Sequence, residues 1–326
     1  MTVFDKARAP DLAEPALRRL AGAATQPRSL TRDAVRALLR NRAAVAGFAF
    51  ILLIILLAIL APVVAPHSPT QQNLLNIYAP PSAEHLLGTD QFGRDILTRI
   101  LYGARVSLSV AIVTVSAVLL IGVPVGLLTG YYGGTLDFVL MRLVDVMYAI
   151  PDLLFIILIS TFLNAVLAED ATGLLRVVQH VHQLTGGLVG VFIALALFGW
   201  LTLSRLVRGQ ILSLRNNDYV LAARAIGASD RRIILVHLLP NAMAPMIVAA
   251  ALLVPSFILA EAGLSFLGLG IQPPRASWGI MIAEGVVALR AHPHAMLFPG
   301  LALSLTLLSF NFLGDGLRDA LDPFMR

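Results

Sequence analysis

Long apolar runs alternate with short polar segments along most of this chain. Six runs hold about 20 residues each, which at about 1.5 Å per residue is enough to cross a hydrocarbon core of roughly 30 Å. Five of them contain no charged residue, and the third contains only Asp152. The runs cover residues 43–64, 106–129, 150–168, 187–204, 242–260 and 295–313. The pattern predicts an all-α, polytopic membrane protein with six transmembrane helices.

The first run also resembles the apolar part of a secretory signal peptide. It follows a 42-residue leader and is itself 22 residues long, whereas signal h-regions hold about 7–15 residues. We therefore expect a retained transmembrane helix.

Composition agrees with a membrane protein. The chain is 58% hydrophobic and only 13% charged, whereas an average soluble domain is about a quarter charged. The absence of cysteine excludes disulfides and thiolate chemistry. The net charge of +5 comes from arginines beside the apolar runs, with no interleaved stacking aromatics, so we expect contact with a lipid bilayer and not with nucleic acid.

The basic residues also predict an orientation. If the N-terminus is cytoplasmic, 18 of the 24 Lys and Arg residues fall on the cytoplasmic side. Positive charge collects on that side of membrane proteins. We therefore expect both termini in the cytoplasm.

The polar segments divide the chain into regions. Residues 1–28 are expected to be disordered, and an amphipathic helix that starts near Ser29 is expected to lie in the membrane interface. The predicted regions are a cytoplasmic tail 1–42, a first span 43–65, an extracytoplasmic loop 66–105, a core of five spans 106–313 with a cytoplasmic segment 205–241, and a cytoplasmic tail 314–326.

The extracytoplasmic loop ends in a predicted short surface helix. The apolar positions of residues 96–101 form one stripe, and Asp95 and Arg99 lie at i,i+4 on the other face. His67 and His85 have no partners at metal-ligand spacing, so we expect solvated loop residues there. His180 and His182 in the loop 169–186 have no third ligand nearby, so no metal site is expected in the chain.

Two carboxylates in or beside the spans are candidates for a transport pathway or a subunit interface. Asp152 follows Pro151, where we expect a kink, and Glu261 sits at the end of the fifth span. A charge in the bilayer is costly and is a functional candidate for that reason. A helix-end or inter-subunit hydrogen bond is the alternative for Asp152. The glycine- and proline-rich residues 261–279 exclude a continuous helix and indicate a packed plug or a subunit contact.

The chain carries no energy source of its own. A phosphate-binding P-loop needs a lysine after its glycines, and the only lysine is Lys6 in the leader. The spans lack the paired acids or histidine chains of a proton relay, and no hydrolase motif is present. We therefore expect neither an enzyme nor a self-sufficient pump.

The segment LAARAIGASDRRIILVHLLPN, between the fourth and fifth spans, predicts two short helices. Asp218 is placed to cap the first, Gly227 to end it, and Ser229 or Asp230 to cap the second, which Pro240 would stop. Its alanines would let another protein approach closely, with arginines as a polar rim. A solvated loop is the alternative. The prediction of a docking surface is based on Ala222, Ala223, Ala225, Arg224, Arg231 and Arg232.

Several motifs together resemble those of one transporter family. They are LGTDQFGRD at 87–95, YGARVSLSVA at 102–111, AARAIGASD at 222–230, HLLPN at 237–241, LSFLGLGIQPP at 264–274 and LGDGLRDALDP at 313–323. From about residue 30 the chain resembles permeases of ABC importers, in the dipeptide/oligopeptide branch that also includes nickel and glutathione systems. The resemblance implies the type I importer permease fold in a bacterial inner membrane.

The same resemblance implies partners and a docking site. The partners would be a second, unlike permease subunit, two ATPase subunits that bind ATP and Mg, and an extracytoplasmic peptide-binding protein. The AARAIGASD segment resembles the family's EAA loop, which seats in a groove of the ATPase subunit. Leu221 stands here where the family has Glu, so any salt bridge of that Glu is absent. Carried over by position, the docking residues are Ala222, Ala223, Arg224, Gly227, Ala228, Ser229 and Asp230.

A rival hypothesis is a stand-alone channel or secondary carrier whose cytoplasmic segment binds a regulator. Within the importer hypothesis, peptide, nickel chelate and glutathione all remain open as substrates.

Overall fold

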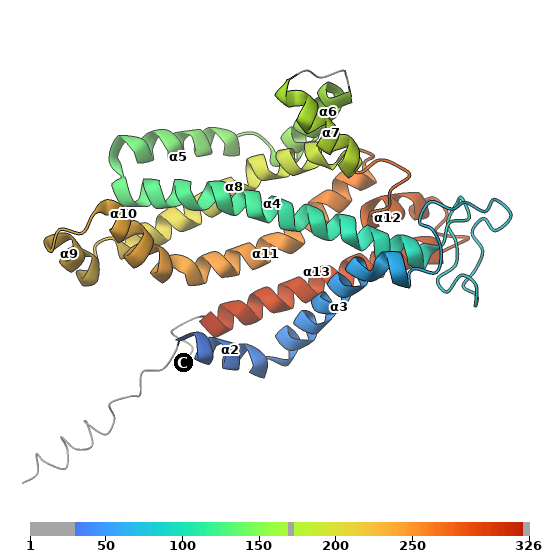
Figure 1. Cartoon of the computed structure of the whole chain (residues 1–326), viewed down its shortest axis with the longest axis horizontal. Coiled ribbons are helices and arrows are strands. Elements are labelled where there is room, and N and C mark those ends of the chain that lie inside the picture. Colours follow the sequence, from blue (N-terminus) through green and yellow to red (C-terminus); the bar gives the residue numbers. More distant parts are fainter. Residues whose placement is uncertain (1–29, 169–172, 322–326) are drawn as a thin grey trace, which may run out of the picture.

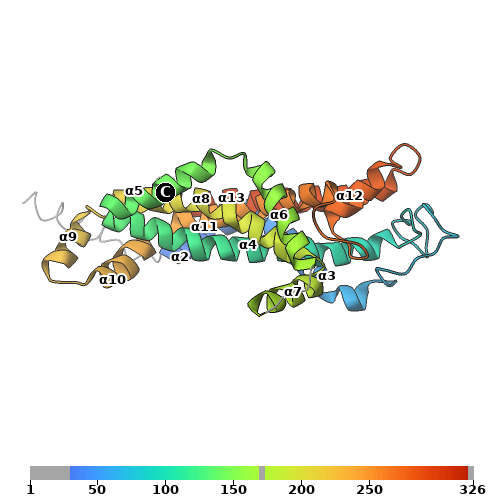
Figure 2. The same ribbon diagram turned by 90° about the horizontal axis from the view of Figure 1, so that it is seen from above.

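The computed structural model describes residues 30–168 and 173–321, and these form helices without a strand. The all-α prediction is confirmed. The helices are α2 (Leu30–Arg40), α3 (Arg42–Val64), α4 (Ile96–Tyr132), α5 (Gly134–Tyr148), α6 (Asp152–Ala168), α7 (Leu174–Thr185), α8 (Leu188–Leu214), α9 (Asp218–Ala225), α10 (Asp230–Arg232), the π-helix η1 (Ile233–Leu238), α11 (Leu239–Phe266), α12 (Trp278–Val286) and α13 (His294–Leu321). The long helices run along the longest axis, with α9 and α10 at one end and α12 at the other (Figures 1 and 2).

Six spans are present when a bent pair of helices is counted as one. Within residues 30–168 and 173–321, five helices are long and apolar enough to cross a membrane, and α5 with α6 makes a sixth that is bent by 89°. The bend lies at Pro151, as predicted. Proline disfavours helical geometry in the residue before it, so α5 ends and a new helix begins at Asp152.

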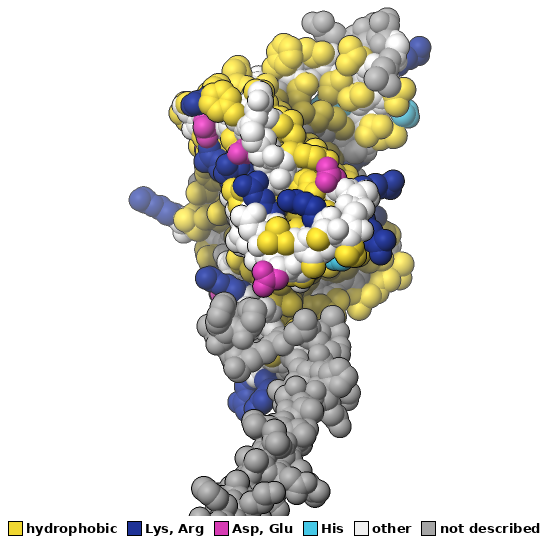
Figure 3. All heavy atoms as spheres, turned by 90° about the vertical axis from the view of Figure 1, so that its left-hand side faces the viewer, with side chains coloured by type: hydrophobic (Ala, Val, Ile, Leu, Met, Phe, Trp, Pro, Cys, Tyr) yellow, Lys and Arg dark blue, Asp and Glu magenta, His cyan; other side chains and the backbone are white. Residues whose placement is uncertain are grey.

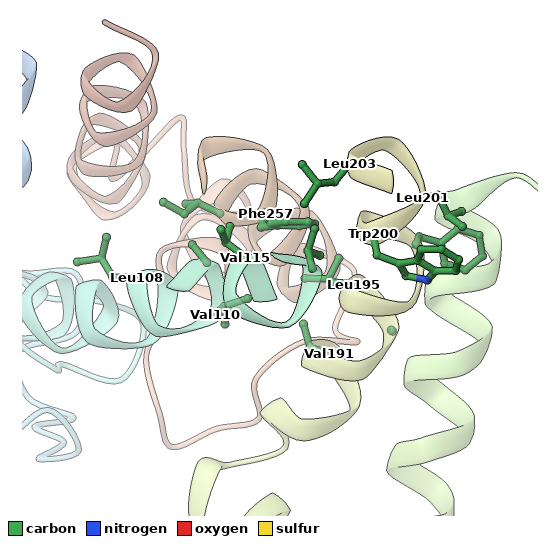
Figure 4. Packing of buried hydrophobic residues seen from close by; sticks show 14 of the residues in the cluster. Leu108, Val110, Val115, Val191, Leu195, Trp200, Leu201, Leu203 and Phe257 are labelled. Atoms are coloured by element: carbon green, nitrogen blue, oxygen red, sulfur yellow. The ribbon is translucent and has the colours of Figure 1, made fainter. Parts of the chain in front are cut away.

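The packing of α4 on α8 forms the centre of the bundle. Glycines on α4 allow the two backbones to approach closely, since a Cβ at Gly126 would lie 2.5 Å from the Val207 Cβ, and one at Gly130 would lie 2.7 Å from the Ile211 Cβ. Larger apolar side chains then fill the adjoining core. Val115 of α4, Leu195 of α8 and Phe257 of α11 meet there (Figure 4).

Three predicted boundaries differ from the structure. The expected surface helix before the second span is wrong, because α4 runs from Ile96 to Tyr132 without a break. The expected loop 169–186 contains α7 from Leu174 onward, closed by Gly186 in a left-handed conformation. The last helix, α13, continues to Leu321, so residues 314–321 of the predicted tail are helical.

The glycine- and proline-rich segment after α11 is partly packed inside the chain, and residues 272–275 remain exposed. The helix persists to Phe266, and irregular backbone then leads to α12. Ile271 and Ala276 in this segment are buried, as is Trp278 at the start of α12. Irregular backbone at membrane depth has to be buried in protein.

The amphipathic N-terminal helix is present as α2, which packs against α13. Its Val35 and Leu39 side chains remain exposed, as an interfacial helix requires. The predicted disorder of residues 1–28 lies outside the described residues.

Candidate functional site in the insert between α8 and α11

The insert, defined here as α9, α10, η1 and the turn joining them (residues 218–238), begins one residue earlier than predicted. Asn217 occupies the N-cap in an extended conformation, and Asp218 is the first helical residue. The prediction of Asp218 as the cap is therefore wrong. In the first turn its carboxylate instead lies at the positive end of the helix dipole.

The turn after α9 is the one that Gly227 predicted. Gly227 has φ +81°, in the left-handed region that glycine favours. The Ala228 N–H donates to the Ala223 carbonyl at 3.0 Å, and the Gly227 N–H donates to the Arg224 carbonyl at 3.0 Å. These two bonds form a Schellman motif. The turn is thus held by backbone alone, and its outer surface stays free.

The second helix of the insert does not stop at Pro240. Ser229, extended at ψ 151°, precedes α10, and η1 leads directly into α11. The π-helical turns widen the backbone just before Pro240, where an α-helix would press the proline ring against the carbonyl of Val236. The result is one helix of 37 residues, Asp230–Phe266, that starts in the insert and runs through the core.

The predicted docking residues divide into an outer and an inner set. Ala222, Arg224, Gly227, Ser229 and Asp230 are exposed, and Ala228 is half-buried. Ala223 is only 6% exposed and belongs to the hydrophobic core together with Val220 and Ile233. Ala223 therefore holds α9 onto η1 and does not lie on the outer surface of the insert.

Sequence reasoning missed the most exposed apolar residue of the insert. Ile226 is 86% exposed at the end of α9, and Leu221 on the same helix is 47% exposed. The sequence signal that could have identified Ile226 is a large apolar residue directly before the glycine that ends the helix. Figure 3 looks onto this end of the molecule, where arginines surround a surface that also carries hydrophobic side chains. Such a surface is typical of a protein interface.

Both parts of the insert are fixed to the end of α4. The Tyr131 hydroxyl donates to the Asp230 carboxylate at 2.6 Å, and the Arg224 guanidinium lies 5.7 Å from the centre of the Tyr131 ring. Arg215, at the end of α8, donates to the Gly130 carbonyl at 3.1 Å. The insert is therefore seated on the bundle.

Ion pairs hold α5 against the part of α8 that leads into the insert. Arg208 donates to both carboxylate oxygens of Asp137, at 2.5 and 2.7 Å, and Arg205 donates to Asp145 at 2.6 Å. Bidentate arginine–carboxylate pairs fix orientation as well as distance. These pairs join α5 to the part of α8 that leads into the insert.

The two carboxylate candidates lie in different surroundings. Asp152 is exposed at the start of α6, where its Oδ1 accepts the Leu153 N–H at 2.7 Å. Glu261 is fully buried and accepts hydrogen bonds from Ser107 at 3.0 Å and Ser265 at 2.7 Å. Glu261 thus joins α4 to α11 inside the subunit, whereas Asp152 is accessible; a role of either residue in a pathway or a subunit interface stays a prediction.

The opposite end of the bundle is the cap, defined as residues 66–95 together with α12. Arg99, expected on a surface, is 1% exposed beneath it. Arg94 donates to Asp90 at 2.7 Å and to Glu284 of α12 at 3.0 Å, and Arg99 pairs with Glu284 at 2.9 Å and also with Asp90. The loop folds back over the first turn of α4, and the acids of the loop and of α12 meet the arginines there.

His85 is likewise not a solvated loop residue. It is 7% exposed, and its Nδ1 lies 3.0 Å from Asp95 Oδ1. The other oxygen of Asp95 caps α4 by accepting the Thr98 N–H at 2.8 Å. The prediction failed because the partner of His85 lies ten residues further along the chain and only the folded loop brings the two together.

Comparison with known proteins gives matches along nearly the whole chain. A family model described as the binding-protein-dependent transport system inner membrane component matches residues 122–326. A second, described as the N-terminal TM domain of oligopeptide transport permease C, matches residues 29–81.

Individual relatives agree with the family models. The chain is 43% identical over 299 residues to a dipeptide transport system permease protein of Bacillus subtilis, covering 91% of this chain and 87% of the relative. It is 39% identical over 298 residues to an oligopeptide transport system permease protein of Escherichia coli K12, covering 91% and 92%. A glutathione transport system permease protein of Pectobacterium atrosepticum is 38% identical over 296 residues, covering 90% and 91%.

Proposed function

Because the chain belongs to the family of binding-protein-dependent transport system inner membrane components, we propose that it is the permease subunit of an ATP-driven importer of di- or oligopeptides. The proposal of a peptide substrate is based on the relatives, which are named for dipeptide and oligopeptide transport. Glutathione is the second candidate, since one similar relative is a glutathione permease. Nickel chelate, allowed by the sequence motifs, is the third.

The importer would be an assembly in which this chain forms half of the pathway. Its partners would be a second homologous permease subunit, two ATPase subunits that hold ATP and Mg, and an extracytoplasmic binding protein that selects the substrate. Large exposed side chains on α5 and α6, such as Phe138, Leu154 and Phe162, supply apolar surface for lipid and for a second permease subunit.

The insert would be the point at which the ATPase subunits act. One observation carries this proposal: the exposed turn of the insert leads into a single helix from Asp230 to Phe266. When ATP binding draws the ATPase subunits together, a push on the insert moves α11 as a lever, and Arg205 and Arg208 carry the motion to α5. The pathway then alternates between outward- and inward-facing states.

In this assembly the protein would lie in the bacterial inner membrane with both termini, and the insert, in the cytoplasm. The arginine distribution supports that orientation. Because the chain contains no cysteine, single Ile226→Cys and Val287→Cys variants test it. A membrane-impermeant maleimide applied to the outer face of the membrane should label position 287 and not position 226.

Reconstitution tests the importer itself. Proteoliposomes holding this chain, its permease partner, the ATPase subunits and the binding protein should accumulate labelled peptide only with ATP. Uptake by this chain alone would contradict the importer and support a channel or secondary carrier. Binding assays on the cognate binding protein decide between peptide, glutathione and nickel chelate.

A further inference from the structure

Three potential metal ligands meet in the cap: His67, and the neighbouring pair Glu84 and His85 further along the chain. His67 lies just after α3, and Glu84 and His85 lie in the loop that connects α3 to α4. One ligand atom of each lies within 4.8 Å of the others. The two imidazole rings are 4.7 Å apart between centroids and tilted by 32°. The fold therefore places two imidazoles and one carboxylate around a single point.

A buried carboxylate, Asp95, is hydrogen-bonded to one ring and lies close to the other. Asp95 Oδ1 lies 3.0 Å from Nδ1 of His85 and 3.7 Å from Nδ1 of His67. Since Nδ1 of His85 is committed to Asp95, its Nε2 is the nitrogen left to bind a ligand. Metal-bound histidines characteristically donate their other ring N–H to a carboxylate in this way.

The state of His67 gives an independent observation. Its Nδ1 is buried and has no hydrogen-bond partner among the described residues. A buried ring nitrogen without a partner calls for an explanation. A metal on Nε2 would fix the proton on Nδ1 of His67, and a shift of a few tenths of an ångström would bring that N–H into hydrogen-bond distance of Asp95.

The backbone around the three residues is held in place. The His67 N–H donates to Thr98 Oγ1 at 3.3 Å, and the His85 N–H donates to Ser82 Oγ at 3.1 Å. The His85 carbonyl accepts the Gly88 N–H at 2.8 Å. Both histidines are thus positioned by the loop and the first turn of α4, and only the exposed Glu84 side chain has to turn to complete the set.

We propose that His67, Glu84 and His85 bind a zinc ion, with a water as fourth ligand, that fastens the start of the cap to residues 84 and 85. Two imidazoles and a carboxylate form a donor set that suits zinc, whereas magnesium and calcium prefer oxygen ligands only. The ion ties the segment after α3 to the part of the loop whose His85 contacts Asp95, the N-cap of α4. This site is separate from the insert and does not depend on the transported substrate.

Zinc titration of the purified full-length chain, carrying a histidine-free tag and stripped with chelator, tests the site. We expect one zinc per chain by calorimetry and a higher Tm with zinc than without it. Glu84→Gln and His67→Gln should each weaken zinc binding about tenfold or more. His180→Gln, which removes an exposed histidine from α7, is the matched control and should bind as the wild type does.

Two results would overturn the proposal. Either zinc binds with unchanged affinity when His67 or Glu84 is replaced, or the His180→Gln control loses binding to the same extent. Excess magnesium should not displace the zinc, and displacement would also contradict the site. Monodisperse elution of each variant during gel filtration shows that a loss of binding is not a loss of fold.

Discussion

The insert and the cap close opposite ends of the same helix bundle (Figure 1), and they are built differently. The insert leaves Ile226 86% exposed, and its turn is held by backbone hydrogen bonds alone. The cap buries Arg94 and Arg99 in ion pairs with Asp90 and Glu284. The insert presents a surface that another protein would cover. In the cap, the chain's own side chains pair with the buried arginines.

This difference bears on how each end responds to force. Buried ion pairs add little net stability but are costly to break, so the cap should move as one piece. The insert is joined to the bundle by a helix that continues into α11 and by the contact between Asp230 and Tyr131. Movement should therefore enter at the insert, while the cap keeps its shape.

The largest expected effect is on the cap. Arg99→Met removes one of the two arginines that pair with Asp90 and Glu284. Because the remaining acids are largely buried, the free energy of unfolding should fall by about 3–5 kcal/mol. Denaturant unfolding of the purified protein measures it. Arg105→Met, at an exposed position of the same helix, should change the free energy by about 0.5 kcal/mol or less. Equal effects of the two changes would contradict a self-supporting cap.

The second effect is on docking at the insert. Ile226→Asp should weaken binding of the ATPase subunits about tenfold, because it places a charge where an apolar contact is expected. The free energy of unfolding should stay unchanged, since this side chain contacts water in the isolated chain. Val287→Asp is the matched control, because Val287 is also 86% exposed but lies just after α12. Co-purification with the ATPase subunits reports the difference, and equal losses for both variants would refute it.

A smaller effect is expected at the turn of the insert. Gly227→Ala should destabilise the turn by about 1 kcal/mol, because φ is +81° there. The added methyl group itself meets no described atom within 4 Å. Gly209→Ala has the same open space in a helical conformation and should be neutral or stabilising. ATP-driven uptake should fall for the first and not for the second, and equal uptake would remove the turn from the coupling route.

The smallest effect is expected at the seat of the insert. Tyr131→Phe removes the hydrogen bond to Asp230, worth about 1 kcal/mol. We expect a modest loss of peptide uptake per ATP hydrolysed, since α10 is then less firmly fixed to α4. Ser116→Ala, which removes a bond to the Ile112 carbonyl within α4 and away from the insert, should leave this ratio unchanged. A ratio that stays constant in both variants would show that the Tyr131 contact carries no motion.

Much of the fold was predictable because it depends on local rules. The length of the apolar runs predicted the spans, Pro151 predicted the bend, and Gly227 predicted the turn that closes α9. The prediction that a helix ends at Pro240 was wrong, although a proline normally ends a helix. The π-helical turns of η1 accommodate this proline, and they depend on how the chain packs there.

The cap was not predictable because its contacts are distant in the sequence. Arg99 meets Glu284, which lies 185 residues further along the chain, and no periodicity encodes that pair. The burial of Ala223 escaped prediction for a similar reason. A stripe of alanines predicts close packing without saying whether the chain's own helix or a partner supplies the other side.

The central claim, that the insert is where the ATPase subunits dock, is tested most directly by single-cysteine labelling. The chain has no cysteine of its own, so Ile226→Cys and Val287→Cys each give one reactive site of equal exposure. The account predicts that adding the ATPase subunits slows maleimide labelling at position 226 at least tenfold and leaves position 287 unchanged. Unchanged labelling at position 226 in an assembly that still hydrolyses ATP and imports peptide would contradict it.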